Sequence, residues 1–177
     1  MKQVLPLAIE GGMSQSGSFV LMLCELDGDR QMPIVIGAAE AQAILLAKEA
    51  VETRRPLTHE TMVHVMQQFG LTLKRVTIDR VVDGVFYATL HISDGFNTQQ
   101  TDSRTTDAVT LALLSEAPIY VDDKVLEECS VRIEKTDEGE PTVEELEAAL
   151  RLCEETEDYE RAAEIQAQID NLKKGNG

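Results

Sequence analysis

Residues 101–114 read TDSRTTDAVTLALL, in which two acids and a cation occupy six positions before an apolar run. The change in composition predicts that a helix begins here, with the hydroxyls of Thr105 and Thr106 capping its first turn. Asp107 then lies in that turn, where the helix dipole favours a negative charge. Arg104 lies between the two acids, and its planar guanidinium suits a carboxylate or a phosphate. The stretch therefore predicts either a metal or phosphodiester site or an ion-pair network that fixes a helix.

Runs of predicted strands and helices surround this stretch. Asp-Gly pairs at 27–28, 83–84 and 94–95 are typical of hairpin turns. Three consecutive strands joined in this way predict an antiparallel meander. We therefore expect an α+β fold, with a largely antiparallel sheet and packed helices. The predicted strands are 4–9, 18–26, 31–36, 71–80, 85–92, 97–102 and 118–121, and the predicted helices are 38–47, 58–69, 105–115 and 122–127. The helix at 38–47 is apolar on most faces, so we expect it to be buried against the sheet. Thr58 is the expected cap of the helix at 58–69.

A second, smaller part is predicted after the main domain, which we place at residues 1–134. Residues 135–141 are polar, charged and broken by Gly and Pro, which is typical of a linker. Residues 142–174 predict an α-helical hairpin, with apolar residues at three- and four-residue steps. Such a hairpin is too small to be stable alone. We expect it to pack on a copy of itself, on the main domain or on another protein, so a homo-oligomer is expected.

Composition narrows the classes of partner and compartment. The 177 residues carry 32 Asp and Glu against 16 Lys and Arg, a formal net charge of -16. That charge disfavours nucleic acid as a partner, because nucleic-acid binding normally rests on a basic surface. No segment reaches the apolar length of a membrane span. The three cysteines are far apart and form no CxxC pair, which fits a reducing cytoplasm.

Four motifs of the main domain resemble the bifunctional nuclease domain family. They are MPIVIG followed by EAQAI at 32–44, RPLTHE at 55–60, DSRTTDA at 102–108 and PIYV at 118–121. The family usually has Pro-Ser where this chain has Thr105 and Thr106. The resemblance implies an enzyme that hydrolyses DNA or RNA.

The C-terminal residues 142–174 resemble the UVR motif. This helical hairpin binds partner proteins in nucleotide-excision-repair proteins and in some protein-quality-control adaptors. The residues that carry the resemblance are Leu146, Leu150, the run EDYERAA at 157–163, Ile165, Ile169 and Leu172. The resemblance implies a protein partner for this segment.

Phosphodiester cleavage usually needs carboxylates that hold a divalent metal, together with a cation or a base. Mg2+ takes oxygen ligands, so Mg2+ or Mn2+ is the expected cofactor. His59 can act as a general acid or base. The candidate catalytic residues are His59, Glu60, Asp102 and Asp107, the candidate phosphate-binding residues are Arg55 and Arg104, and the candidate metal ligands are Glu40, Asp102 and Asp107.

The alternative is a non-enzymatic, oligomeric adaptor protein in which the acid–arginine cluster is structural. In that interpretation Asp107 stabilises the start of a helix and Glu40 pairs with Arg104. A zinc protease is excluded, because Val63 stands where the second histidine of an HExxH motif is needed. The net charge favours the adaptor, and the family resemblance favours the nuclease.

Overall fold

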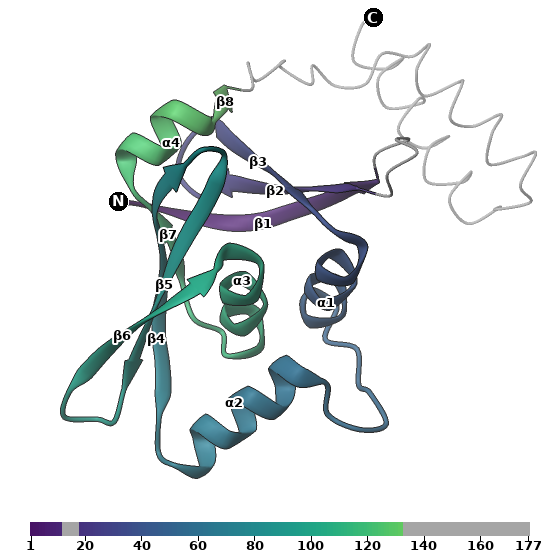
Figure 1. Ribbon diagram of the computed structural model, residues 1–177, viewed down its shortest axis with the longest axis vertical. Helices are drawn as coiled ribbons and strands as arrows, with labels where there is room; N and C mark the ends of the chain where they lie inside the picture. The colour runs from purple at the N-terminus through teal and green to yellow at the C-terminus, as the bar shows by residue number, and fades with distance from the viewer. Residues whose placement is uncertain (12–17, 133–177) are drawn as a thin grey trace, which may run out of the picture. The chain divides into compact units, whose positions relative to one another are not determined.

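The computed structural model describes residues 1–11 and 18–132 (Figure 1). The predicted linker at 135–141 and the predicted hairpin at 142–174 lie outside these residues. Within them the fold is α+β, as the sequence predicted. In these residues, eight strands form one sheet in the order β6-β5-β4-β7-β1-β2-β3-β8, and four packed helices accompany it. The sheet is mixed but mostly antiparallel, because β4 and β7 are its parallel neighbours among the described strands.

One side of the sheet is built from the N-terminal strands β1 (Lys2–Gly11), β2 (Phe19–Glu25) and β3 (Arg30–Ile36), which pair antiparallel. Their alternate apolar residues enter the core. At the turn after β2, Glu25 accepts two hydrogen bonds from Arg30, at 2.8 and 2.9 Å. This bidentate ion pair closes the β2–β3 hairpin.

Two helices follow β3. The first, α1 (Ala38–Lys48), buries only Ala41 and Ile44 and packs mainly on α3 (Thr105–Leu114). The prediction that it is apolar enough to be buried against the sheet was therefore wrong. The second, α2 (Thr58–Gln68), ends before Gly70, whose φ of +70° is the left-handed conformation predicted for a glycine after a helix.

The predicted meander is present as β4 (Thr72–Val82), β5 (Val85–Ser93) and β6 (Thr98–Arg104). Asp83 and Gly84 both have positive φ in the turn between β4 and β5, as a two-residue hairpin requires. The chain passes from β6 directly into α3. The exposed edge strand of the meander therefore delivers the polar stretch at 102–107 to the start of a helix.

After α3 the chain returns to the middle of the sheet as β7 (Ile119–Val121). It then forms α4 (Asp123–Cys129) and the short edge strand β8 (Val131–Arg132). The sequence did not predict β8, because two residues become a strand only through pairing with β3.

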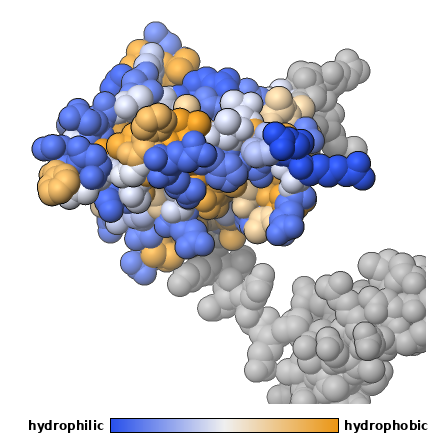
Figure 2. Space-filling view, turned by 90° about the horizontal axis from the view of Figure 1, so that it is seen from below, coloured by the Kyte–Doolittle hydropathy of each residue, from blue (hydrophilic) through white to orange (hydrophobic). Residues whose placement is uncertain are grey.

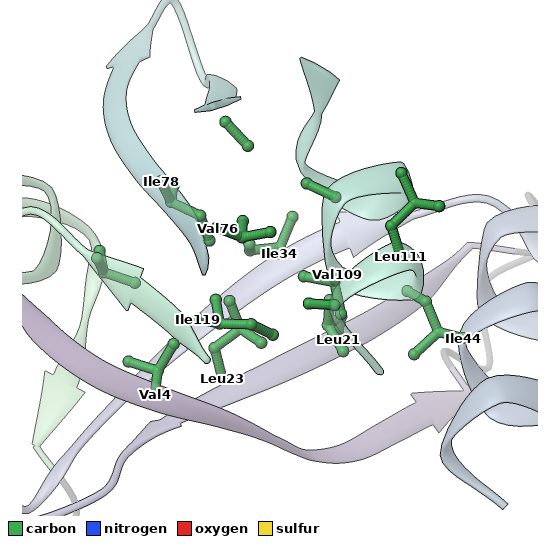
Figure 3. Packing of buried hydrophobic residues seen from close by; sticks show 14 of the residues in the cluster. Val4, Leu21, Leu23, Ile34, Ile44, Val76, Ile78, Val109, Leu111 and Ile119 are labelled. Carbon is green, nitrogen blue, oxygen red and sulfur yellow. The ribbon is translucent and has the colours of Figure 1, made fainter. Parts of the chain in front are cut away.

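The sheet bends around the helices, so α1, α2 and α3 lie inside the bend (Figure 1). Figure 3 shows Leu21 and Ile119 of the sheet near Val109 of α3. Val109 and Leu111 of α3 are 0% and 2% exposed. Burying an aliphatic side chain of this size contributes about 1.5–3 kcal/mol. The core therefore fixes α3, and with it the position of Asp107.

Two predicted helix caps were wrong in detail. The cap of α3 is Arg104, which is extended at φ -63° and ψ 144° as the last residue of β6. Thr105 is thereby already inside the helix, and its buried Oγ1 has no partner among the described residues. The cap of α2 is Leu57 instead of Thr58. No helix in the described part of the chain is both long and apolar enough to span a membrane.

Candidate functional site

The first turns of three helices meet at one small cavity. Glu40 is the third residue of α1, His59 the second of α2 and Asp107 the third of α3. Arg104, the cap of α3, completes the charged lining. The cavity measures about 120 Å³ and is lined by Ala39, Glu40, Ala43, His59, Arg104, Thr106, Asp107 and Thr110.

Arg104 joins the two carboxylates of the cavity. Its Nε and Nη2 donate to Oδ2 and Oδ1 of Asp107 at 2.7 and 3.0 Å, and its Nη1 donates to Oε1 of Glu40 at 3.1 Å. These hydrogen bonds raise the pKa of Arg104, with Asp107 as the main cause. A guanidinium has five N–H donors, so two remain after these three bonds. The Arg104 side chain is 67% exposed, and an anion in solution can reach it.

His59 and Asp107 form a pair at the floor of the same cavity. The His59 Nε2 and the Asp107 Oδ1 are 3.1 Å apart, with side chains 22% and 29% exposed. The hydrogen bond from Arg104 lowers the pKa of Asp107, burial opposes it, and the bond to His59 lowers it further. Asp107 is therefore ionised at neutral pH. An ionised carboxylate on one ring nitrogen leaves Nδ1 of His59 to exchange a proton with a ligand.

Gly37 allows Glu40 to reach Arg104. A Cβ at Gly37 would lie 2.6 Å from Oε2 of Glu40, so a larger residue there would displace the carboxylate. The acid in the first turn of α1 is in turn favoured by the helix dipole. The start of α1 thus holds the carboxylate that α3 needs for its ion pair.

The side chains of the cavity and the helix N-termini around it contribute charge of opposite sign. Glu40, Asp107 and Arg104 sum to one negative charge. Each helix N-terminus acts as roughly half a positive charge, so three of them contribute about +1.5. The balance is close to zero or slightly positive, within a protein of net charge -16. The cavity is therefore a place in this acidic chain where an anion can be held.

Asp102 does not join this cavity. Its side chain is 74% exposed, and its ion-pair partner is Arg80, whose Nη2 is 3.8 Å from Oδ1 of Asp102. Arg80 also stacks over the ring of Tyr87 at 4.3 Å and donates to Asp79 at 3.0 Å. Although Asp102 is two residues from Arg104 in the sequence, it belongs to a separate polar cluster on β4, β5 and β6.

Glu60 and Arg55 also lie apart from the cavity. Oε2 of Glu60 accepts hydrogen bonds from the backbone N–H of Leu57 at 2.7 Å and from the Thr53 hydroxyl at 3.0 Å. These bonds, first the backbone one, lower the pKa of Glu60. Neighbouring residues on a helix are about 100° apart, so Glu60 cannot share the direction of His59. Arg55 is exposed in the loop before α2, and its side chain forms no ion pair with a described residue.

A divalent metal does not fit the described arrangement. Both carboxylates of the cavity are bonded to Arg104, and Asp102 lies elsewhere. In the described ranges, no three or more His, Cys, Asp or Glu side chains are grouped so that they could hold a metal ion. A cation would have to displace the guanidinium from both carboxylates, so we derive no catalytic step through a metal.

Sequence reasoning gave Thr106 only a capping role and did not name Thr110, but both residues line the cavity. The Thr110 hydroxyl donates to the carbonyl oxygen of Thr106 at 2.8 Å. The sequence contained a signal for Thr110, because residues three or four apart on a helix share a face. Thr110 follows Asp107 by three positions and Thr106 by four. The predicted contact between Glu40 and Arg104 is present, and it is the one that the structural alternative required.

Comparison with known proteins gives two findings. The sequence model of the bifunctional nuclease domain matches residues 21–134. Uncharacterized proteins from two strains of Mycobacterium tuberculosis are each 38% identical over 123 residues, which is 70% of this chain and 73% of each relative. The matched region contains every side chain that lines the cavity.

Proposed function

Because this chain belongs to the bifunctional nuclease domain family, we propose that it hydrolyses phosphodiester bonds of DNA or RNA at the cavity of Glu40, His59, Arg104 and Asp107. The observation that carries the proposal is the meeting of three helix N-termini beside an exposed arginine. Helix N-termini are ready-made anion sites, since their backbone N–H groups and dipoles face the ligand.

In the proposed reaction a phosphate binds the two free N–H donors of Arg104. His59 takes a proton from the attacking water through its Nδ1. The new P–O bond forms, the bond to the leaving oxygen breaks, and that oxygen takes a proton from solvent. Asp107 stabilises the imidazolium that forms on His59. Arg104 and the helix N-termini stabilise the charge that develops on the phosphorus oxygens.

The test is a cleavage assay on single- and double-stranded DNA and RNA. We expect wild-type protein to cut at least one substrate. His59→Ala removes the base and Arg104→Gln removes the phosphate ligand, so each is expected to lower the rate at least a hundredfold. Circular dichroism must show that both variants are folded. A wild-type protein that cleaves nothing in this panel contradicts the proposal.

A specific observation also favours the adaptor alternative. Arg104 is paired with both carboxylates of the cavity, as in a purely structural ion-pair network. The alternative predicts that Arg104→Gln lowers the free energy of unfolding and has no enzymatic phenotype. The nuclease proposal predicts that Arg104→Gln lowers the cleavage rate strongly and the free energy of unfolding only slightly. The same variant therefore separates the two functions.

We further propose that the chain forms a homo-oligomer. Met62, Val65 and Phe69 are 50%, 47% and 77% exposed and lie on one face of α2. Figure 2, which views the molecule from the side of α2, shows apolar atoms gathered within a mostly polar surface. This stripe carries no charge, so two copies can meet there without bringing like charges into contact. Residues 142–174 support a protein partner through their resemblance to the UVR motif.

A further inference from the structure

A second cavity, of about 370 Å³, lies along α2 and shares no lining residue with the cavity of the candidate site. Its polar lining includes Glu52, Glu60, His64 and Gln67, and its apolar lining includes Val63 and Leu114. Cavities that hold small molecules start at roughly 300 Å³ and combine apolar walls with a few polar groups. This one is therefore large enough for a nucleobase, and nothing in the proposed reaction uses it.

The carboxylate of Glu60 is fixed at the wall of this cavity. Leu57 and Thr53 both donate to its Oε2, so that oxygen holds the side chain in place. Its Oε1 has no hydrogen-bond partner in the part of the chain that the structure describes. A carboxylate that is held by one oxygen and open at the other is a pre-organised acceptor for an N–H group.

The residues that line the cavity indicate which kind of ligand it can bind. Glu52 and Glu60 repel a phosphate but accept hydrogen bonds from the N–H groups of a neutral ring. Guanine presents its N1–H and its N2 amino group side by side, and its O6 can accept from the Gln67 amide. Uracil has one N–H between two acceptors, and adenine and cytosine offer one amino group beside an acceptor. The set of two carboxylates matches guanine best.

The position of the cavity suits a strand bound at the candidate site. His59 lines the smaller cavity, while Glu60 and Gln67 line the larger one. An α-helix rises about 1.5 Å per residue, so Gln67 lies about 12 Å along α2 from His59. That is the span of a few nucleotides. Single-stranded bases that are splayed out can be read at their hydrogen-bonding edges.

We infer that the cavity lined by Glu52, Glu60 and Gln67 is a nucleobase subsite that prefers guanine. The inference rests on the proposed function, since it gives that nuclease a preferred substrate. The side chain of an arginine from another molecule is an alternative ligand for the same two carboxylates. The experiment therefore also measures binding of an arginine derivative.

The experiment measures binding of guanosine and adenosine to the full-length protein by calorimetry. Guanosine carries no phosphate, so binding does not depend on the candidate catalytic residues. We expect guanosine to bind at least tenfold more tightly than adenosine, and Glu52→Gln to weaken guanosine at least tenfold. Glu49→Gln is the matched control, since Glu49 is exposed and does not line the cavity. Equal binding of the two nucleosides, no effect of Glu52→Gln, or tighter binding of N-acetyl-arginine amide than of guanosine each overturns the inference.

A cleavage arm separates this inference from the proposed function. Wild-type protein is expected to cut single-stranded RNA of mixed sequence preferentially near guanine, and Glu52→Gln to lose that preference while still cutting guanine-free RNA. Cleavage without any base preference contradicts the subsite and leaves the nuclease standing. Binding of guanosine without any cleavage supports the subsite and contradicts the nuclease.

Discussion

Replacing Asp107 by asparagine separates a catalytic role from a structural one. Asp107 accepts three hydrogen bonds, two from Arg104 and one at 3.1 Å from His59. Asparagine keeps one oxygen and replaces the other by an N–H donor that faces Arg104. The change therefore removes one bond to Arg104, the charge attraction, and the partner that stabilises a protonated His59.

The expected loss of stability and the expected loss of catalytic rate differ enough to be distinguished. Asp107 is 29% exposed and Arg104 67% exposed, so the pair is screened by water, and pairs of this kind contribute up to about 1 kcal/mol. In a domain of this size that is a loss of roughly 2–4 °C in Tm. A mispositioned general base costs about 10²–10⁴ in rate, or roughly 2.7–5.5 kcal/mol of barrier.

The assay pairs urea denaturation with single-turnover cleavage for wild type, Asp107→Asn and Asp102→Asn. Asp102 is the comparison, because the sequence placed it with Asp107 and the structure places it beside Arg80. We expect Asp107→Asn to lose at least a hundredfold in rate, and Asp102→Asn to stay within about threefold. A loss of more than about 3 kcal/mol in the free energy of unfolding, with a rate within tenfold of wild type, would refute the catalytic role.

Three further outcomes are expected. The pKa of Glu25 is lowered to about 2 from 4.5, chiefly by its hydrogen bond to Arg30. Stability from this pair is therefore complete above pH 4.5 and is lost as pH falls towards 2, by about 3 kcal/mol at roughly 1.4 kcal/mol per pKa unit. Urea denaturation between pH 7 and 3 should show this slope, and Glu25→Gln should flatten it. Cleavage should persist in EDTA, since Arg104 occupies the carboxylates of the cavity; loss that only Mg2+ or Mn2+ restores would instead support the metal site. Phe69→Lys should shift the mass measured by light scattering towards the monomer, and a wild type that is already monomeric at micromolar concentration rules out the oligomer.

Much of the fold was predictable because its elements are encoded by neighbouring residues. The Asp-Gly turns and alternating residues of the meander specify β4, β5 and β6 locally, and Gly70 marks the end of α2. The parallel pairing of β4 with β7 was not predictable, because the paired residues Val76 and Ile119 are far apart in the sequence. The caps of α2 and α3 were misplaced by one residue, since the preceding extended segments decide where each helix starts.

The contacts of the candidate site also divide into those that the sequence predicts and those that only the tertiary structure brings about. Contact between Arg104 and Asp107 follows from a spacing of three residues on one helix start, and the sequence supports it directly. Contact between His59 and Asp107 spans 48 residues, and the bond from Arg104 to Glu40 spans 64. Such contacts form only when α1, α2 and α3 pack together inside the bend of the sheet.

The sequence by itself determined the fold class, the family and the residue types that the site draws on, because these depend on local patterns and motifs. Tertiary structure alone decided which acids meet. Strand pairing turns Asp102 towards Arg80, and helix geometry turns Glu60 away from His59, although each is next or nearly next to a site residue in the chain. Direction in space is set by packing over long separations, and adjacency along the chain does not fix it.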